Sequence, residues 1–80
     1  MSQINQSLAK IITNQRRIIN ISQEELAARA EVHRTYISQI ERGLKSPTLP
    51  VLFRIAKALN TTASHLISNI EKEIHELQKQ

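Results

Sequence analysis

The stretch from Ser22 to Gly43 constrains the fold most, because it reads as two short helices joined by a tight turn. Ser22 can cap the first helix through its hydroxyl, and Glu25 can reach back to the Ser22 amide, which makes a capping box. Apolar residues then recur at helical spacing. His33 or Thr35 can start the second helix, and Gly43 is well placed to end it. We therefore predict two packed helices over residues 22–43.

Helices of about eight residues are too short to be stable alone, because helix nucleation is costly. They must pack on each other and on neighbouring helices, and Ala27 is expected where the two cross closely. The side expected to be buried comprises Leu26, Ala30, Ile37 and Ile40. The outward side of the second helix is polar and positive, and it comprises Arg34, Thr35, Ser38, Gln39 and Arg42. A helix that presents such a face at an angle is what reading of the DNA major groove requires.

The composition favours one small all-α domain over residues 1–80. The chain has one Gly and two Pro, which leaves little room for the turns of a sheet protein. It has no Cys, so disulfides and thiolate metal sites are excluded, which fits a reducing cytoplasm. No apolar run approaches the ~20 residues of a membrane span, and the first residues lack the blocks of a signal peptide. We therefore expect no membrane partner.

The positive charge is concentrated in the first part of the chain. Residues 1–70 carry nine Lys and Arg against four Glu, whereas residues 71–80 carry two Lys against three Glu. A positive body with a mixed-charge tail suggests a polyanion as the partner of the body. The charge alone is equally consistent with an ordinary basic bacterial protein that binds no nucleic acid. The polar and positive face of the predicted helix pair favours nucleic acid as the partner.

Two further helices are expected to build the core around the pair. The first covers residues 3–19, and its apolar side comprises Leu8, Ile11, Ile12, Ile18 and Ile19. The second follows the cap Thr48, has Pro50 in its first turn, where the missing N–H costs nothing, and runs to about Leu59. Its core stripe comprises Leu49, Leu52, Ile55, Ala56 and Leu59. Phe53 is expected in the core or at its edge, where it could join a dimer seam.

The last helix is expected from Ala63 to near Gln80, about 18 residues, and it carries a heptad-like apolar seam. The seam consists of Ala63, Ile67, Ile70, Ile74 and Leu77, spaced 4, 3, 4 and 3 residues apart. Ile70, Ile74 and Leu77 are expected to lie beyond what so small a core covers. We therefore expect a homodimer in which the same helix of a second copy covers Ile67 and these three residues. The alternatives are that they fold back on the first helix or that the end of the last helix frays.

The chain carries no constellation for catalysis or for a metal. The three His residues, at positions 33, 65 and 75, show no ligand spacing with one another or with carboxylates. There is no Gly-rich phosphate loop, no nucleophile beside a base and no carboxylate pair. We expect neither an enzyme nor a cofactor.

Several blocks of the sequence resemble the helix-turn-helix of the phage-repressor type, the Cro and Xre-like family. They comprise residues 22–27 (SQEELA), 34–43 (RTYISQIERG), 46–49 (SPTL) and 55–59 (IAKAL), and the resemblance covers roughly residues 8–67. Within this family, the segment Arg-Thr-Tyr-Ile-Ser (residues 34–38) is most similar to the corresponding segment of restriction-modification controller proteins. One departure is Glu31, which stands in the turn where the family usually has a left-handed Gly. A non-Gly residue costs roughly 1 kcal/mol there.

The resemblance implies a five-helix repressor-like domain that acts as a sequence-specific transcriptional regulator. Such a protein would be cytoplasmic and associated with the bacterial nucleoid, and it would bind double-stranded DNA with a palindromic operator as a homodimer. RNA polymerase is a further candidate partner. The alternatives are an antitoxin whose last helix grips a toxin, a phage-type repressor, and a module of the same fold that binds only protein.

Individual residues are assigned roles from their chemistry and position, and the resemblance adds those of Gln23 and of the Arg16–Glu41 pair. The candidates for base contacts are Arg34, Thr35, Gln39, Ser38 and Tyr36. Arg34 comes first because its guanidinium fork matches O6 and N7 of guanine, whereas Tyr36 has the alternative of packing against the preceding helix. The candidates for phosphate contacts are Gln23, Arg42, Lys45 and Arg17. Arg16 is expected to pair with Glu41 and tie the first helix to the third, with solvation or a phosphate contact as its alternatives.

Overall fold

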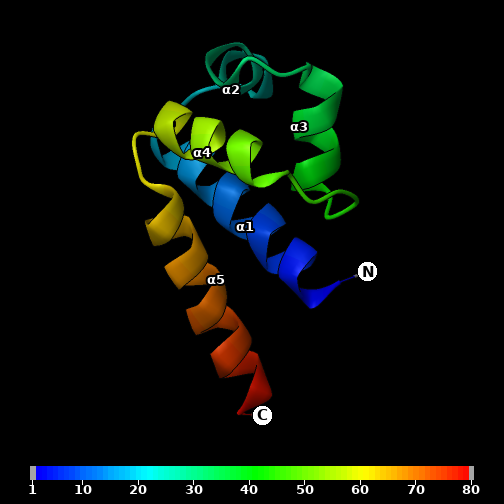
Figure 1. Ribbon diagram of the computed structural model, residues 1–80, viewed down its shortest axis with the longest axis vertical. Helices are drawn as coiled ribbons and strands as arrows, with labels where there is room; N and C mark the ends of the chain where they lie inside the picture. Colours follow the sequence, from blue (N-terminus) through cyan, green and yellow to red (C-terminus); the bar gives the residue numbers. More distant parts are fainter. Residues whose placement is uncertain (1, 80) are drawn as a thin grey trace.

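The computed structural model describes residues 2–79 and contains five helices, with no strand in that range. The helices are α1 (Gln3–Ile18), α2 (Gln23–Ala30), α3 (Arg34–Glu41), α4 (Leu49–Ala58) and α5 (Ala63–Gln78). In Figure 1, α1 and α4 overlap at the centre of the view, α2 and α3 lie together at one end, and α5 extends away from them. The predicted all-α class and the five helices are confirmed. The last helix was expected to end near Gln80, which lies outside the described residues.

Each helix starts at a side chain that accepts a hydrogen bond from a first-turn N–H. The five caps are Ser2, Ser22, His33, Thr48 and Thr62. They satisfy backbone donors that a helix leaves unpaired at its start. The Ser22 Oγ accepts from the Glu25 N–H at 3.0 Å. The Glu25 carboxylate instead accepts from Arg29 Nε at 3.1 Å, so this capping box is closed from one side only.

The core lies where the five helices meet. The inward side of the α2–α3 pair is buried as predicted, and the most completely buried large side chains are Ile12, Leu26, Ile37, Ile40, Ile55, Leu59 and Leu66. Two expected core residues are exposed instead, Leu49 at 61% and Ile18 at 75%. Each occupies the terminal position of its helix, beyond the edge of the packed region. Phe53 follows the buried Leu52 and points to the edge, 59% exposed.

α5 folds back beside α1 instead of projecting freely (Figure 1). Ile70 is 8% exposed and belongs to the core, and Ile74 packs against that core. The Lys10 Nζ on α1 lies 3.7 Å from the Glu73 Oε1 on α5. The expectation that Ile70 lies beyond the chain's own core is therefore wrong. Because α1 supplies an apolar side of its own, this part of the seam is covered within the chain.

The turn between α2 and α3 passes through a left-handed residue at Glu31, with φ 58° and ψ 42°. The Glu31 N–H donates to the Ala28 carbonyl at 3.2 Å, and the Val32 N–H donates to the Ala27 carbonyl at 3.0 Å. This pattern closes the end of α2 as a left-handed helix cap does. The predicted backbone conformation is thus present, with a side chain where Gly would be unstrained.

Replacing Glu31 by Gly should therefore raise the free energy of unfolding by about 1 kcal/mol, because Gly adopts positive φ without the Cβ clash. Urea unfolding followed by circular dichroism measures the change. Ala28→Gly on the exposed side of α2 is the matched control, and it should lower stability by about 1 kcal/mol, because that position is helical. Equal destabilisation by both changes would contradict the strain at Glu31.

Candidate nucleic-acid interface

α3 presents its predicted polar face at the surface of the molecule. Arg34 and Thr35 are exposed, and Ser38 and Gln39 are half-buried on the same helix, whose opposite side enters the core. Tyr36 is half-buried and packs against the core, as its alternative role required. Four polar side chains thus remain accessible on one short helix. Their donors and acceptors suit the edges of bases in a major groove.

The start of α3 is fixed by His33, one of the two starting points that the sequence offered. Its Nδ1 accepts a hydrogen bond from the Thr35 N–H at 3.2 Å. The cap settles the first turn, from which Arg34 and Thr35 project. An imidazole acceptor is an uncommon helix cap, and the usual preference for Ser, Thr, Asp or Asn gives little warning of it.

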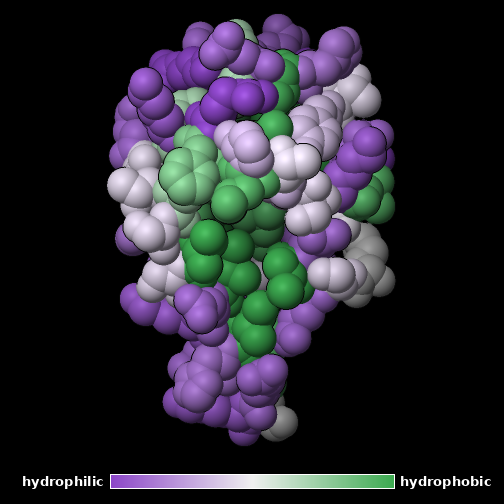
Figure 2. All heavy atoms as spheres, in the orientation of Figure 1, coloured by the Kyte–Doolittle hydropathy of each residue, from purple (hydrophilic) through white to green (hydrophobic). Residues whose placement is uncertain are grey.

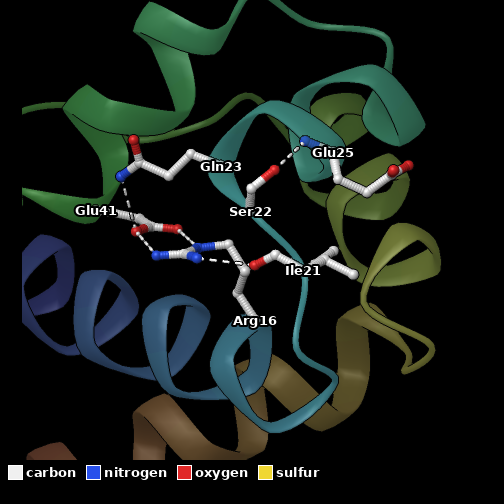
Figure 3. Close-up of polar contacts among 6 residues, drawn as sticks. All are labelled: Arg16, Ile21, Ser22, Gln23, Glu25 and Glu41. Carbon is white, nitrogen blue, oxygen red and sulfur yellow. Dashed lines mark hydrogen bonds and ion pairs between the residues drawn. The ribbon is translucent and has the colours of Figure 1, made fainter.

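A buried ion pair holds α3 against α1 (Figure 3). The Arg16 Nε donates to Glu41 Oε2 at 2.7 Å, and its Nη2 donates to Glu41 Oε1 at 3.0 Å. The Arg16 Nη1 also donates to the Ile21 carbonyl at 2.9 Å, which ties down the link to α2. The Arg16 and Glu41 side chains are 14% and 5% exposed. Arg16 and Glu41 therefore form the bidentate pair that the resemblance implied, and neither is free to contact DNA.

Gln23 completes this network from the first position of α2. Its Nε2 donates to Glu41 Oε1 at 3.1 Å, and Figure 3 shows the amide directed toward the ion pair. Burial alone would raise the pKa of Glu41, but the hydrogen bonds from Arg16 and Gln23 and the charge of Arg16 hold that pKa below its ordinary value. Gln23, a candidate for phosphate contact, thus also serves the packing of α2 on α3.

The other candidates for phosphate contact surround α3. Arg42 and Lys45 are exposed just after its end, and the Lys45 Nζ lies 5.9 Å from the centre of the Tyr36 ring. Arg17 is exposed on α1, and it lines the same open hollow between α1 and α3 as Arg42. The positive side chains therefore flank the polar face of α3 on more than one side. This arrangement suits a backbone that passes on both sides of a groove.

A further ion pair lies at the other end of α3. The Arg34 Nε is 3.8 Å from Glu24 Oε1, and both side chains are largely exposed. Sequence reasoning missed this contact, because it joins two helices whose relative placement no spacing rule supplies.

Among residues 2–79, no group of three His, Cys, Asp or Glu side chains could hold a metal ion. Over the same residues, no helix is long and apolar enough to cross a membrane.

The chain is similar to known proteins over most of its length. The helix-turn-helix family model matches residues 12–66. The control protein C.SmaI of Serratia marcescens is 43% identical over 65 residues, which are 81% of this chain and 77% of that protein. A transcriptional regulator of the helix-turn-helix type from Mycobacterium tuberculosis is 46% identical over 55 residues, 69% of this chain but only 39% of that protein.

A solved structure shares the arrangement of the helices. It is the restriction-modification controller protein C.Esp1396I, crystallised as a tetramer in complex with its natural 35-base-pair operator. The two chains superpose with a TM-score of 0.83 at 31% identity, over 92% of this chain and 97% of the other. The similarity therefore covers α3 and all the elements that hold it.

Glu41→Gln should lower the free energy of unfolding at pH 7 by about 2–3 kcal/mol, because it leaves the buried Arg16 without a full counter-charge. The wild-type protein should lose this advantage on acidification. Its Glu41 pKa is lowered by folding, so the contribution is complete above the ordinary Glu pKa of about 4.3 and disappears as the pH falls through the folded value.

Urea unfolding of both proteins between pH 7 and pH 3 measures this difference. Glu25→Gln is the control, because Glu25 forms an exposed pair with Arg29 within α2 and should change stability by less than about 0.5 kcal/mol. A gap between wild type and Glu41→Gln that stays constant down to pH 3 would contradict the assignment.

Proposed function

Because this chain belongs to the helix-turn-helix family of DNA-binding transcriptional regulators, we propose that it is a controller protein of a restriction-modification system. In this proposal it is a cytoplasmic protein associated with the bacterial nucleoid, and it binds a palindromic operator as a homodimer. The observation that carries the proposal is the accessible polar face of α3, fixed from below by the buried Arg16–Glu41 pair. RNA polymerase is a candidate partner on the operator.

α3 enters the major groove in this proposal, with its first residues nearest the bases. Arg34 donates to O6 and N7 of a guanine, which is the contact that its planar fork fits best. Thr35 offers a methyl group to thymine or a hydroxyl to a base, and Gln39 pairs with an adenine. Ser38 is a secondary base contact, and Tyr36 contributes its hydroxyl from a ring that packs against the core.

The phosphates are contacted by a different set of side chains. Arg42 and Lys45 bind the backbone beside the end of α3, Arg17 binds it from α1, and Gln23 binds it at the start of α2. These contacts position the protein without reading sequence. Each neutralised phosphate releases counterions, so affinity should fall steeply with salt.

The homodimer is proposed to form through the apolar band that Figure 2 shows over α4, α1 and α5. Hydrophilic side chains bound this band on both sides, toward α2 and α3 and toward the end of α5. Phe53, Ile67 and Leu77 are exposed at 59%, 39% and 45%, and Ile74 is half-buried. Ile70 is omitted from the seam, because its own chain covers it. In this proposal the two α3 helices of the dimer read half-sites about one helical turn of DNA apart, ~34 Å.

Binding-site selection from a random duplex library tests the proposed function directly. The expected result is a pseudo-palindromic consensus that wild-type protein binds at least ~1,000-fold more tightly than random duplex. Enrichment of no consensus, together with affinity that does not respond to salt, would overturn DNA binding. A protein captured under those conditions would favour the antitoxin or protein-binding alternatives.

Arg34→Ala should weaken operator binding by about 1–3 kcal/mol and relax the choice of one base pair, because it removes a bidentate base contact. Lys45→Ala is the matched comparison, and it should weaken operator and random duplex alike and reduce the salt slope by about 1. Fluorescence anisotropy on both duplexes measures the changes. Equal losses of Arg34→Ala on the two duplexes would show that Arg34 does not read a base.

Phe53→Glu should convert the dimer to a monomer at micromolar concentration and weaken operator binding at least tenfold, because it places a charge in the apolar seam. Sedimentation velocity without DNA measures the oligomeric state. Leu44→Glu is the control for the oligomeric state only, since Leu44 is similarly exposed, at 53%, but lies in the loop before α4 and next to the proposed phosphate contact Lys45. A dimer that survives Phe53→Glu would place the seam elsewhere.

A further inference from the structure

His33 carries a hydrogen-bond donor whose identity and direction are set by its own chain. Its Nδ1 accepts from the Thr35 N–H at 3.2 Å and thereby caps α3. A neutral imidazole has one donor and one acceptor nitrogen, so an Nδ1 that accepts leaves the proton on Nε2. The cap therefore selects one tautomer, in which the second polar atom of the ring is an N–H.

The Nε2–H of His33 is directed away from the first turn of α3. The two nitrogens lie on different sides of the ring, so when Nδ1 faces the Thr35 N–H, the Nε2–H points out beyond the start of the helix. His33 is exposed, and within residues 2–79 its Nε2 makes no hydrogen bond to another protein group. The donor therefore lies beside Arg34, at the end of α3 that is proposed to come nearest the bases.

We propose that His33 is a specificity-determining residue that donates from Nε2 to an acceptor in the major groove, on the base pair next to the one that Arg34 reads. This inference rests on the proposed function and deepens it. The acceptors available are N7 and O6 of guanine, N7 of adenine and O4 of thymine, whereas cytosine presents only an amino donor. His33 thus selects an acceptor atom where Arg34 selects a guanine.

The base contact of His33 adds to the cap and does not compete with it. Nδ1 and Nε2 belong to one rigid ring that the cap already holds, so binding breaks no hydrogen bond of the free protein and orders little that was free. Where the duplex has an acceptor at this place, the donor exchanges water for a base. Where the duplex has an amino group there, the donor loses water and gains no partner, which is the costly outcome. The difference favours operator over random duplex.

Two amide substitutions separate the donor of His33 from its cap. His33→Asn keeps an acceptor near the place of Nδ1, and Asn is a preferred N-cap, but its side chain is too short to reach the place of Nε2. His33→Gln carries an amide nitrogen near the place of Nε2, but Gln is not among the preferred N-caps. His33→Asn should therefore keep or raise the urea midpoint of unfolding and lose the base contact, whereas His33→Gln should lower the midpoint and keep the contact.

The experiment measures binding of both variants to operator and to random duplex at about pH 8, where imidazole is neutral. His33→Asn should bind operator about fivefold more weakly, with random duplex within about twofold of wild type. Its salt slope should not change, because the lost donor carries no charge. Binding-site selection with His33→Asn should lose the preference at one base pair and keep the guanine that Arg34→Ala loses. His33→Gln should keep the wild-type preference at both base pairs.

Affinity that follows stability, with His33→Asn like wild type and His33→Gln weakened, would overturn the proposal and leave His33 as a cap alone. Equal losses of His33→Asn on operator and random duplex would also overturn it, because they indicate a phosphate contact. Loss of the same base pair as in Arg34→Ala would do so too, because His33 would then act through Arg34. If wild-type protein prefers no duplex in the selection, the proposed function itself fails, and that result appears before any variant is made.

Discussion

The buried pair between Arg16 and Glu41 is the interaction on which the arrangement of the helices depends. Two charged groups are expensive to remove from water, and the cost is offset only when geometry and further hydrogen bonds satisfy both. Here the Ile21 carbonyl and the Gln23 amide provide those further bonds. Because the four groups come from α1, α2, α3 and the link between the first two, none of these elements can shift without leaving a charge unsatisfied. The pair thus fixes the orientation of α1, α2 and α3 relative to one another in a protein with a small core.

Most of the fold follows from local patterns in the sequence. The α2–α3 pair is recognisable from Ser22, from apolar residues at helical spacing and from Gly43, because these features act within a few residues of each other. The left-handed turn at Glu31 is predictable from the place of the break, although the residue there is unfavourable. The burial of Leu26, Ile37 and Ile40 follows because two short helices have no other means of stability.

What the sequence could not supply depends on contacts between distant parts of the chain. The spacing of Ile67, Ile70, Ile74 and Leu77 is the same whether the covering helix is α1 or belongs to another copy, so the pattern could not predict that Ile70 is buried within the chain. Leu49 continues the core periodicity of α4, yet it lies one turn too early to reach the packed region. The pair of Glu24 with Arg34 depends on the angle between α2 and α3, which no local pattern contains.

α1 packs against both α3 and α5. It contacts α3 through the Arg16–Glu41 pair. In a dimer built on α4 and α5, each α3 would therefore be joined to the twofold axis through packed helices, with no hinge between them. In such a dimer the distance between the two α3 helices would be fixed. If the two halves of the operator were moved apart by a single base pair, one half would be rotated around the duplex away from its α3, and binding would require distortion of the dimer or of the DNA.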